Sequence, residues 1–516
     1  MILPTVTSPT RSPAPRIALG APRGALEGTS APWRLRRSEL WALGPVWLLL
    51  GIAYGLTLCP TVWWYDSAEF AASARALNSP HPPGYPTYTF VAHVFSQLGP
   101  EPAWGVNFMS LVFGVVGVSL LYVVQRQLGV RRSVAAAMTL AFGVGTVWWS
   151  NAVVAEVYTP GATCTLGALA LLLAARDHGR VEYCVAAAGV AGLGLGTHLS
   201  IATAGLGFVW LVVTTALDVQ KFSELPGALN RSGVARIWPL AWRCTLALAV
   251  ALLPFVLLPF WDFNRITSAG EWRQWWYIIR GGAFDNLFDE TWSKADYLAR
   301  NWAALGRQLS TPLLVTGFVG LALLLRRRPV EGLGVWLALG GNLGWFWNYR
   351  VHDIEVFFLP AAALLALGVG EAVETALRGV ERIAAEPVAR GLTFASSLLL
   401  VVAASHDLGS RWKDVDYSDR WEAALYGKAL VEQIPANAYF VKYNNHEEWK
   451  YFAVLLYAQK GFGEREDLIV YTNPSREQLV RWTKERPVYV FAPTARVKGR
   501  LKVRREGPAW RVVEVK

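Results

Sequence analysis

The chain has 516 residues, of which 53% are hydrophobic and only 17% are charged, whereas an ordinary soluble domain carries about 25% charged residues. This shortfall favours a membrane protein over a soluble one. The net charge of +11 does not indicate nucleic-acid binding, because much of the basic excess lies in short loops beside apolar segments, as on the cytoplasmic side of a membrane.

The N-terminal segment, residues 1–33, is rich in Pro, Ser, Thr and Ala with scattered Arg. Such a composition buries too little apolar surface to fold, so we expect a disordered cytoplasmic tail. The first apolar run extends from Trp41 to Leu58 and follows a cluster of three arginines within 34–37. Because basic residues mark the inner side of a membrane, this run is predicted to begin inside the cell.

Further apolar runs follow, most of them near the roughly 17 to 25 residues needed to cross a bilayer. They lie at about 105–125, 133–150, 157–175, 183–197, 199–216, 243–260, 309–325, 330–347, 356–377 and 391–405. The predicted inner loops are all basic, as the positive-inside rule requires. Their basic residues are Arg126, Arg131, Arg132, Arg176, Arg180, Lys221, Arg231, Arg236, Arg326, Arg327, Arg328, Arg378, Arg382 and Arg390. The sequence therefore predicts a mainly α-helical, polytopic membrane domain over 34–405 with about eleven transmembrane helices.

The same topology places three segments outside the cell: a loop at about 59–104, an aromatic-rich loop at about 261–308, and residues 406–516. The last segment alternates strand-like and helix-like stretches, which predicts a small extracytoplasmic α/β domain. The predicted strands are 438–443, 467–472 and 487–492, and the predicted helices are 447–459 and 475–484. Without a Gly-rich nucleotide fingerprint or a Ser-His-Asp set, this domain is expected to be substrate-facing or structural.

The first outer loop carries the clearest chemical signal, a pair of carboxylates at Asp66 and Glu69. Their spacing of three places both on one face of a helix, which Trp63, Trp64 and other nearby aromatic residues would hold at the membrane interface. Two such carboxylates can act as a general base and as a metal or orienting ligand. By itself, however, the pair is more typical of a helix start that the helix dipole favours.

A second feature of this loop is the run His81-Pro-Pro-Gly-Tyr-Pro86. Three prolines and a glycine in six residues predict a rigid turn. Irregular backbone beside a bilayer must have its polar groups satisfied, so such a turn favours a functional role. The turn would bring His81 back toward Asp66 and Glu69. A purely structural turn is the alternative interpretation.

Together these motifs resemble glycosyltransferase family 117, which comprises bacterial membrane proteins and protein O-mannosyltransferases of the GT-C superfamily. The resemblance rests first on Asp66-Ser-Ala-Glu-Phe70, the His81–Pro86 run and Val106-Asn-Phe-Met-Ser110. Later motifs are also similar and extend the resemblance over roughly residues 40–475. They are Trp148-Trp-Ser150, Ala155-Glu-Val-Tyr158, Gly192–Leu199, Asp353–Pro360, Ile434–Ala438 and Leu456–Gln459.

The resemblance implies a GT-C glycosyltransferase that uses a polyprenyl-phosphate-linked sugar on the outer face of a bacterial inner membrane. The acceptor would be a protein Ser or Thr, a lipid or a glycan. Asp66 matches the acidic residue that activates the acceptor, so it is assigned as the general base. Glu69 would orient it or bind a divalent metal together with it, and His81 would complete the catalytic set.

The departing lipid phosphate is an anion, which needs cations or hydrogen-bond donors near the outer ends of the helices. The candidates are Arg265, Arg280, Arg350, His198 and His352. Arg350 is the first choice because a guanidinium group suits phosphate geometry, although a lone arginine there could equally snorkel to the interface. Glu156, Tyr158 and Asp353 are further predicted substrate contacts, with Tyr158 expected to pack or to hydrogen-bond rather than to react.

Two other classes of function compete with this reading. A lipid or glycan transporter is expected to show an internal repeat and charges deep within several spans, and we find no such repeat or charge distribution in the sequence. A non-catalytic membrane scaffold is consistent with the sequence and remains an alternative.

Overall fold

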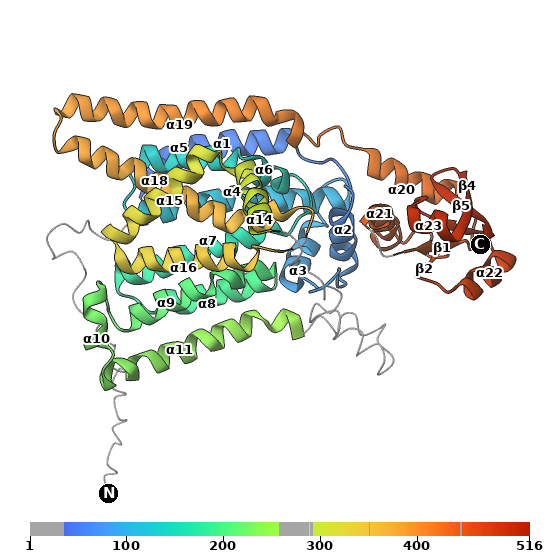
Figure 1. The fold of residues 1–516 in the computed structure, drawn as a ribbon, viewed down its shortest axis with the longest axis horizontal. Coiled ribbons are helices and arrows are strands. Elements are labelled where there is room, and N and C mark those ends of the chain that lie inside the picture. The colour runs from blue at the N-terminus through green and yellow to red at the C-terminus, as the bar shows by residue number, and fades with distance from the viewer. Residues whose placement is uncertain (1–35, 257–287, 289–292, 350, 444–445) are drawn as a thin grey trace, which may run out of the picture.

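The computed structural model describes residues 36–256, 288, 293–349, 351–443 and 446–516. The predicted tail at 1–33, most of the predicted loop at 261–308, and Arg350 lie outside the described residues. The described chain forms a helical bundle with a smaller domain beyond one end of it (Figure 1).

Seven helices in the described part of the chain are long and apolar enough to cross a membrane. They are α1 (Arg37–Leu56), α4 (Pro102–Gln127), α7 (Tyr158–His178), the continuous pair η1 (Leu199–Ala204) and α9 (Gly205–Ala216), α11 (Arg231–Ala251), α18 (Leu359–Glu381) and α19 (Glu386–Val415). The count rises to nine if each of two bent pairs is one span. These pairs are α5 (Arg132–Gly143) with α6 (Thr146–Ala152), and α14 (Lys294–Gln308) with α15 (Thr311–Arg327).

The remaining predicted spans correspond to two shorter helices, α8 (Glu182–Leu195) and α16 (Pro329–Trp345). Every predicted apolar run thus overlaps a helix, and the chain is a multi-pass membrane protein with a mainly α fold. Three predicted runs differ clearly in their bounds. The run at 243–260 belongs to α11, which already begins at Arg231. The run at 133–150 is broken into α5 and α6, which meet at 69°, and α19 continues past 405 to Val415. Three short helices complete the bundle: η2 (Phe222–Glu224), α10 (Leu225–Ala228) and α17 (Ile354–Phe357).

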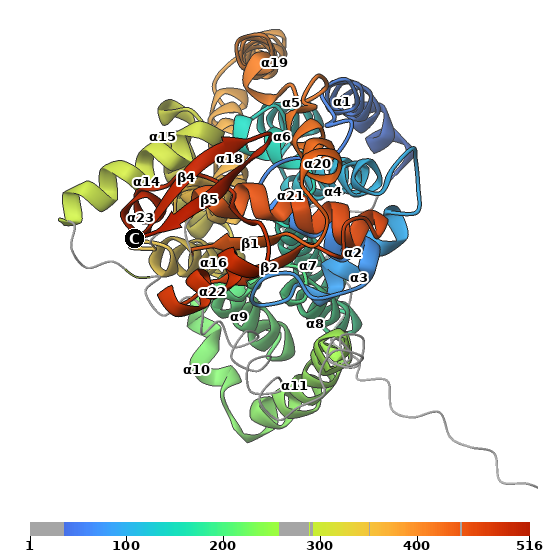
Figure 2. The ribbon, with the colours of Figure 1, turned by 90° about the vertical axis from the view of Figure 1, so that its right-hand side faces the viewer.

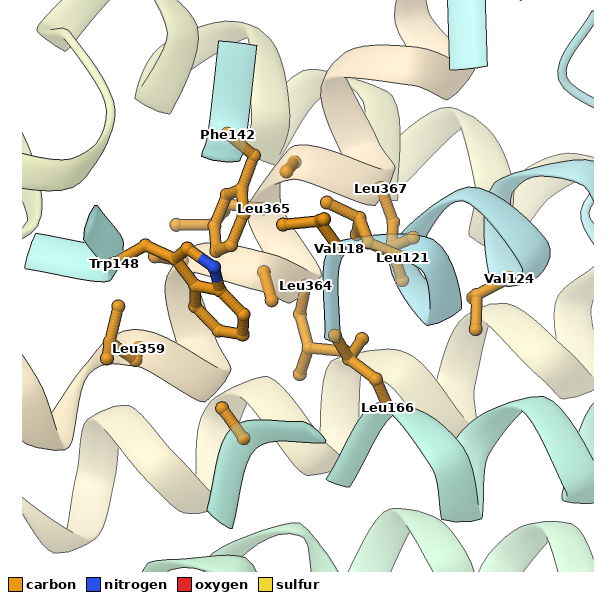
Figure 3. Close-up of a cluster of buried hydrophobic side chains, with 14 of the residues drawn as sticks. Val118, Leu121, Val124, Phe142, Trp148, Leu166, Leu359, Leu364, Leu365 and Leu367 are labelled. Carbon is orange, nitrogen blue, oxygen red and sulfur yellow. The ribbon is translucent and has the colours of Figure 1, made fainter. Parts of the chain in front are cut away.

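The bundle core is apolar and closely packed around Trp148 and Phe142 (Figure 3). Trp148 is fully buried, and its indole donates a hydrogen bond to the Gly114 carbonyl oxygen at 3.2 Å, which satisfies its one polar group. The helices α15 and α18 approach so closely that a Cβ at Gly320 would lie 1.7 Å from the Gly368 carbonyl oxygen. Small residues permit such contacts between membrane helices, where packing rather than water exclusion drives association.

Buried carboxylates and arginines join the helices at the end of the bundle opposite the C-terminal domain. Glu371 pairs with Arg327, and Glu374 pairs with Arg131 and Arg378. Similar pairs are Glu39 with Arg126 and Arg132, Glu331 with Arg176 and Arg328, and Asp177 with Arg328. All of these arginines belong to the predicted inner loops, so the positive charge of those loops also holds helix ends together.

The C-terminal domain contains a five-stranded sheet in the order β2-β1-β3-β5-β4. Its strands are β1 (Tyr439–Lys442), β2 (Ile469–Thr472), β3 (Val488–Val490), β4 (Leu501–Glu506) and β5 (Ala509–Val515), and its helices are α20 (Glu422–Gln433), α21 (His446–Phe462), α22 (Arg476–Glu485) and α23 (Ala495–Arg500). The strands β2, β1 and β3 pair in parallel, whereas β3, β5 and β4 pair antiparallel. The α/β character is as predicted, while α20, α23 and the β4–β5 hairpin were not foreseen.

The first predicted outer loop is itself largely helical. It contains α2 (Asp66–Ala76) and α3 (Pro86–Phe95), which lie between the bundle and the C-terminal domain. Figure 2 views the molecule from the side of this domain, with α21 and the sheet lying over the end of the bundle. Because α2 packs against both α4 and α21, the motif-bearing loop forms the junction between the two parts of the molecule.

Candidate active site

The two motif carboxylates lie in the first turn of α2, with Asp66 as its first residue and Glu69 one turn further. The unpaired N–H groups and the dipole of a helix N-terminus favour negative charge at these positions. Tyr65, immediately before the helix, has φ 59° and ψ −135°. A residue with a Cβ rarely adopts positive φ, and such strained backbone often occurs at functional sites. The backbone of Tyr65 therefore sets the direction in which α2 begins at Asp66.

The His81–Pro86 turn brings His81 against both carboxylates. The His81 backbone N–H donates a hydrogen bond to Glu69 Oε1 at 2.9 Å, and the His81 Nδ1 atom lies 2.5 Å from Glu69 Oε2. On the other edge of the ring, Nε2 lies 3.9 Å from Asp66 Oδ2 and 3.1 Å from the Tyr85 hydroxyl. The imidazole therefore lies between the two carboxylates, which the sequence predicted to be its neighbours.

The charge of His81 is set by opposing effects. Burial lowers the pKa of the imidazole. The neighbouring charges of Asp66 and Glu69, with the Glu69 hydrogen bond, outweigh this effect and raise the pKa to about 9. His81 is therefore protonated at neutral pH, and both ring nitrogens donate hydrogen bonds in that state. Its positive charge offsets part of the negative charge that the two carboxylates bring to the site.

Two more predicted carboxylates gather near Asp66. Glu156 lies in the turn between α6 and α7, where its backbone N–H donates to Ser110 Oγ at 3.3 Å. Burial, followed by the charges of Asp66 and Asp353, raises the pKa of Glu156 well above its usual value. The Asp353 side chain is exposed, yet the protein around it removes enough hydration to raise its pKa to about 6, with further contributions from Asp66 and Glu355. Because their charges influence one another, Asp66, Glu156 and Asp353 form one acidic region at this end of the bundle.

His198 occupies an aromatic pocket rather than a charged one. Its ring stacks on Tyr85 at 6.0 Å between centroids and lies 5.0 Å from Tyr158 and 5.5 Å from Phe357. Its Nδ1 accepts a hydrogen bond from the Ser200 backbone N–H at 3.2 Å, which in the neutral ring leaves the proton on Nε2. Burial, with the nearby charge of His81, lowers the pKa of His198 to about 3. His198 and Tyr158 therefore meet the acidic region as neutral rings.

The predicted phosphate-binding cations are mostly not placed. Arg265, Arg280 and Arg350 lie outside the described residues. His352 is exposed, next to Asp353 and at the same end of the bundle as the acidic region. Beyond His81, the described residues show Lys442 on β1, which the sequence did not single out and whose charge interacts with those of Glu448 and Glu69.

The structure gives the aromatic residues before α2 protein partners that the sequence did not predict. Trp63 packs edge-on against Tyr417 with centroids 5.3 Å apart, and Trp64 packs against Tyr426 and Tyr451, each at 5.7 Å. The Lys450 ammonium also lies 4.5 Å above the Trp64 ring. These side chains contact the C-terminal domain, which covers the loop.

The sequence also missed Trp449 on α21, whose indole N–H donates a hydrogen bond to Asp66 Oδ1 at 2.7 Å. The two residues are 383 positions apart. A tryptophan near the start of an apolar helix reads as a packing residue, and no local pattern connects it with a motif in another domain. The C-terminal domain thus reaches the carboxylate that the motif placed at the centre of the site.

Comparison with known proteins agrees with this geometry. Residues 66–221, which begin at Asp66, match the family model described as the N-terminal domain of the protein O-mannosyl-transferase TMEM260. The mouse protein O-mannosyl-transferase TMEM260 is 22% identical over 440 residues, covering 80% of this chain and 60% of that protein. Its Dictyostelium discoideum counterpart is 30% identical over 92 residues, which are 17% of this chain and 11% of that protein. The chain is therefore similar to the TMEM260 proteins, in the mouse case over most of its length.

Solved structures extend the likeness over nearly the whole chain. ArnT from Cupriavidus metallidurans superposes with a TM-score of 0.60 at 13% identity, both in the apo state and bound to undecaprenyl phosphate. The match covers 92% of this chain and 97% or 98% of ArnT. An oligosaccharyltransferase from Archaeoglobus fulgidus gives a TM-score of 0.50 at 12% identity, covering 87% of this chain and 67% of that one. The chain therefore has the GT-C fold, which confirms the predicted fold class. It spans about three fifths or less of the length of the TMEM260 relatives.

Proposed function

We propose that this chain is a glycosyltransferase that moves a sugar from a polyprenyl-phosphate donor to an acceptor hydroxyl, with protein O-mannosylation as the reaction. The observation that carries the proposal is the cluster of Asp66, Glu69 and His81 at the N-terminus of α2. The cluster lies in, and opens, the segment that matches the O-mannosyl-transferase family model. A lipid-linked donor is supported by the ArnT structure with bound undecaprenyl phosphate.

In this reaction Asp66 acts as the general base. The acceptor oxygen attacks the anomeric carbon, its proton passes to an Asp66 carboxylate oxygen, and the bond from the anomeric carbon to the lipid phosphate breaks. The electron pair of that bond leaves with the phosphate. Glu69 holds the protonated His81 through both of its oxygens, and His81 places a positive charge 3.9 Å from Asp66. Glu69 and His81 thereby orient the base and offset its charge.

The substrate would lie between these residues and the neighbouring outer helix ends. Glu156 and Asp353 offer carboxylates that can bind sugar hydroxyls, and Tyr158 and His198 form an aromatic wall beside them. Arg350 and His352 are the proposed partners of the departing phosphate, which needs a cation as its negative charge develops. The acidic region itself would repel that phosphate, so it suits the acceptor and the sugar better than the lipid head group.

The arginine-rich helix ends lie opposite this site, which supports a cytoplasmic N-terminus and a site on the outer face of a bacterial inner membrane. The C-terminal domain would then be extracytoplasmic. The proposed domains are 34–405 and 406–516, and α19 continues past the boundary between them to Val415.

The proposal is tested with right-side-out membrane vesicles that contain the chain. Polyprenyl-phosphate-mannose is supplied in the outer leaflet together with a Ser/Thr-containing peptide. We expect the peptide to gain one hexose, measured by mass spectrometry, and inside-out vesicles to give no product with external peptide. Absence of transfer with every polyprenyl-linked sugar tried would contradict the proposal. Movement of labelled lipid between leaflets without product would instead support a transporter.

A divalent metal ion could use the same cluster. Asp66, Glu69 and His81 each offer one ligand atom, and these atoms lie within 4.8 Å of one another. Two carboxylate oxygens and an imidazole nitrogen suit several divalent ions, and such an ion would act as a Lewis acid at the acceptor or the phosphate. However, both Glu69 oxygens already accept hydrogen bonds from His81, whose charge serves part of the same electrostatic purpose.

We therefore expect transfer to continue at an unchanged rate after prolonged treatment with EDTA. The measurement compares initial rates of the vesicle reaction with and without chelator, and with Mg²⁺, Mn²⁺ or Zn²⁺ added back. A loss of more than about tenfold that one of these ions restores would show that the reaction requires a metal, and Asp66 and Glu69 would then be its candidate ligands.

A further inference from the structure

The hydrogen bond between Trp449 and Asp66 links the C-terminal domain to the proposed base. The indole N–H donates to Oδ1 at 2.7 Å, while Oδ2 faces His81 Nε2 at 3.9 Å. The two carboxylate oxygens therefore have different surroundings. One accepts a hydrogen bond from a rigid ring, and the other faces the charged imidazole. The Asp66 side chain is 38% exposed, so solvent can reach it.

The indole itself is held from several sides. Its ring lies edge-on to His81 at 6.4 Å between centroids and against Phe452 at 5.7 Å. The Lys442 ammonium lies 5.3 Å from the centre of its ring, within cation–π distance. These contacts fix the direction of the N–H bond, and they come from both the C-terminal domain and the motif loop.

The helix that carries Trp449 is also anchored to the first outer loop further along. The Tyr457 hydroxyl, two turns further along α21, accepts a hydrogen bond from the Ala103 backbone N–H at 3.1 Å and lies 3.2 Å from Glu101 Oε2. Between these points Tyr451 packs against Trp64. The helix α21 is thus docked along its length, and the position of its indole follows from that docking.

We propose that Trp449 is a positioning residue for Asp66, which makes the C-terminal domain part of the active site. A carboxylate at a helix N-terminus rotates readily about its last side-chain bond, and a general base must face the attacking hydroxyl within hydrogen-bond reach. A hydrogen bond to Oδ1 fixes the plane of the carboxylate and leaves Oδ2 for the acceptor proton. The inference rests on the proposed function, because it gives Trp449 a role only if Asp66 is the base.

The test uses the full-length chain with Trp449→Phe, which keeps an aromatic ring but removes the N–H donor. We expect kcat to fall about ten- to a hundredfold, as is typical for losing a hydrogen bond to a charged group and the placement that it provides. The KM values for donor and acceptor should stay within about twofold of the wild-type values, because a positioning residue acts through Asp66 and not through contact with the substrates. Thermal unfolding in detergent checks that the variant is folded.

The matched control is Trp482→Phe in the same domain. Trp482 packs against Tyr439 and Tyr471 beneath the sheet and touches no residue of the proposed site, so its kcat should remain at the wild-type value. Trp449→Leu serves as a second variant without a side-chain donor if Trp449→Phe is not recovered in folded form.

A double variant separates positioning from a general structural effect. If Trp449 acts through Asp66, adding Trp449→Phe to Asp66→Asn should cause no further loss of the residual rate. Multiplying losses, a raised KM at unchanged kcat, or wild-type turnover of Trp449→Phe would each overturn the inference. A wild-type chain that transfers no sugar would instead refute the proposed function, so the two failures are distinguishable.

Discussion

Replacing Asp66 by Asn should lower the rate of sugar transfer by about 10²- to 10⁴-fold, the contribution typical of a general base. The amide has nearly the shape of the carboxylate but cannot accept the proton of the acceptor hydroxyl at neutral pH. Its oxygen can still accept the hydrogen bond from Trp449, so the contact with the C-terminal domain should persist. The loss should therefore appear in kcat, measured with saturating donor and acceptor, while both substrates still bind.

The matched control is Asp419→Asn, the same chemical change at an exposed position between α19 and α20. Its turnover should equal that of the wild-type chain. Both variants should unfold within a few degrees of the wild-type temperature. A rate for Asp66→Asn within tenfold of wild type would refute its assignment as base, and Glu156→Gln would then be the next variant to measure.

The part of the site that the sequence could predict is local. Asp66, Glu69 and His81 fall within sixteen residues, and a proline-rich turn constrains the chain between α2 and α3, so their approach follows from short-range geometry. Glu156, His198 and Asp353 were placed at the same end because each lies near the end of an apolar run. Their roles stay predictions, since proximity alone assigns no function to them.

What the sequence could not predict depends on side chains far apart in the chain. The break between α5 and α6 is stabilised by Gln308, whose amide donates to the Phe142 carbonyl oxygen at 2.8 Å and accepts from the Trp148 backbone N–H at 2.8 Å. A distant glutamine thus satisfies backbone groups that a continuous helix would pair internally. The apolar run at 133–150 has the length of an ordinary membrane span, so its sequence does not reveal the break. The partners of Trp63 and Trp64 were missed for the same reason, because they lie in the C-terminal domain.

The two ends of the bundle use charge in opposite ways. At the proposed site, carboxylates outnumber the cations that the described residues place beside them, and burial keeps Glu156 from ionising readily. At the other end, each buried carboxylate has an arginine within hydrogen-bond distance. Excess charge of one sign at a site costs stability unless something compensates for it. We therefore expect the end with the arginine–carboxylate pairs, called the paired end, to hold the bundle together. The end with Asp66 would carry out the proposed chemistry.

That expectation gives a stability prediction for Arg176, which is fully buried at the paired end of α7. Its guanidinium donates to Glu331 Oε1 at 3.0 Å, to Thr214 Oγ1 at 3.0 Å and to the Val219 carbonyl oxygen at 2.9 Å. Arg176→Met should lower the free energy of unfolding by about 3–5 kcal/mol, because it leaves the buried Glu331 with less compensating charge and two other acceptors unpaired. Equilibrium unfolding in mixed micelles, or thermal unfolding in detergent, measures the change.

The control is Arg390→Met, which removes an arginine from the exposed pair with Glu386 on α19. Because water screens that pair, the free energy of unfolding should change by less than about 1 kcal/mol. The double variant Arg176→Met/Glu331→Leu should recover most of the stability lost in Arg176→Met, since it removes the uncompensated charge and leaves Arg328 paired with Asp177. Equal losses at Arg176 and Arg390, or a double variant less stable than Arg176→Met, would show that these buried pairs do not hold the helix ends together.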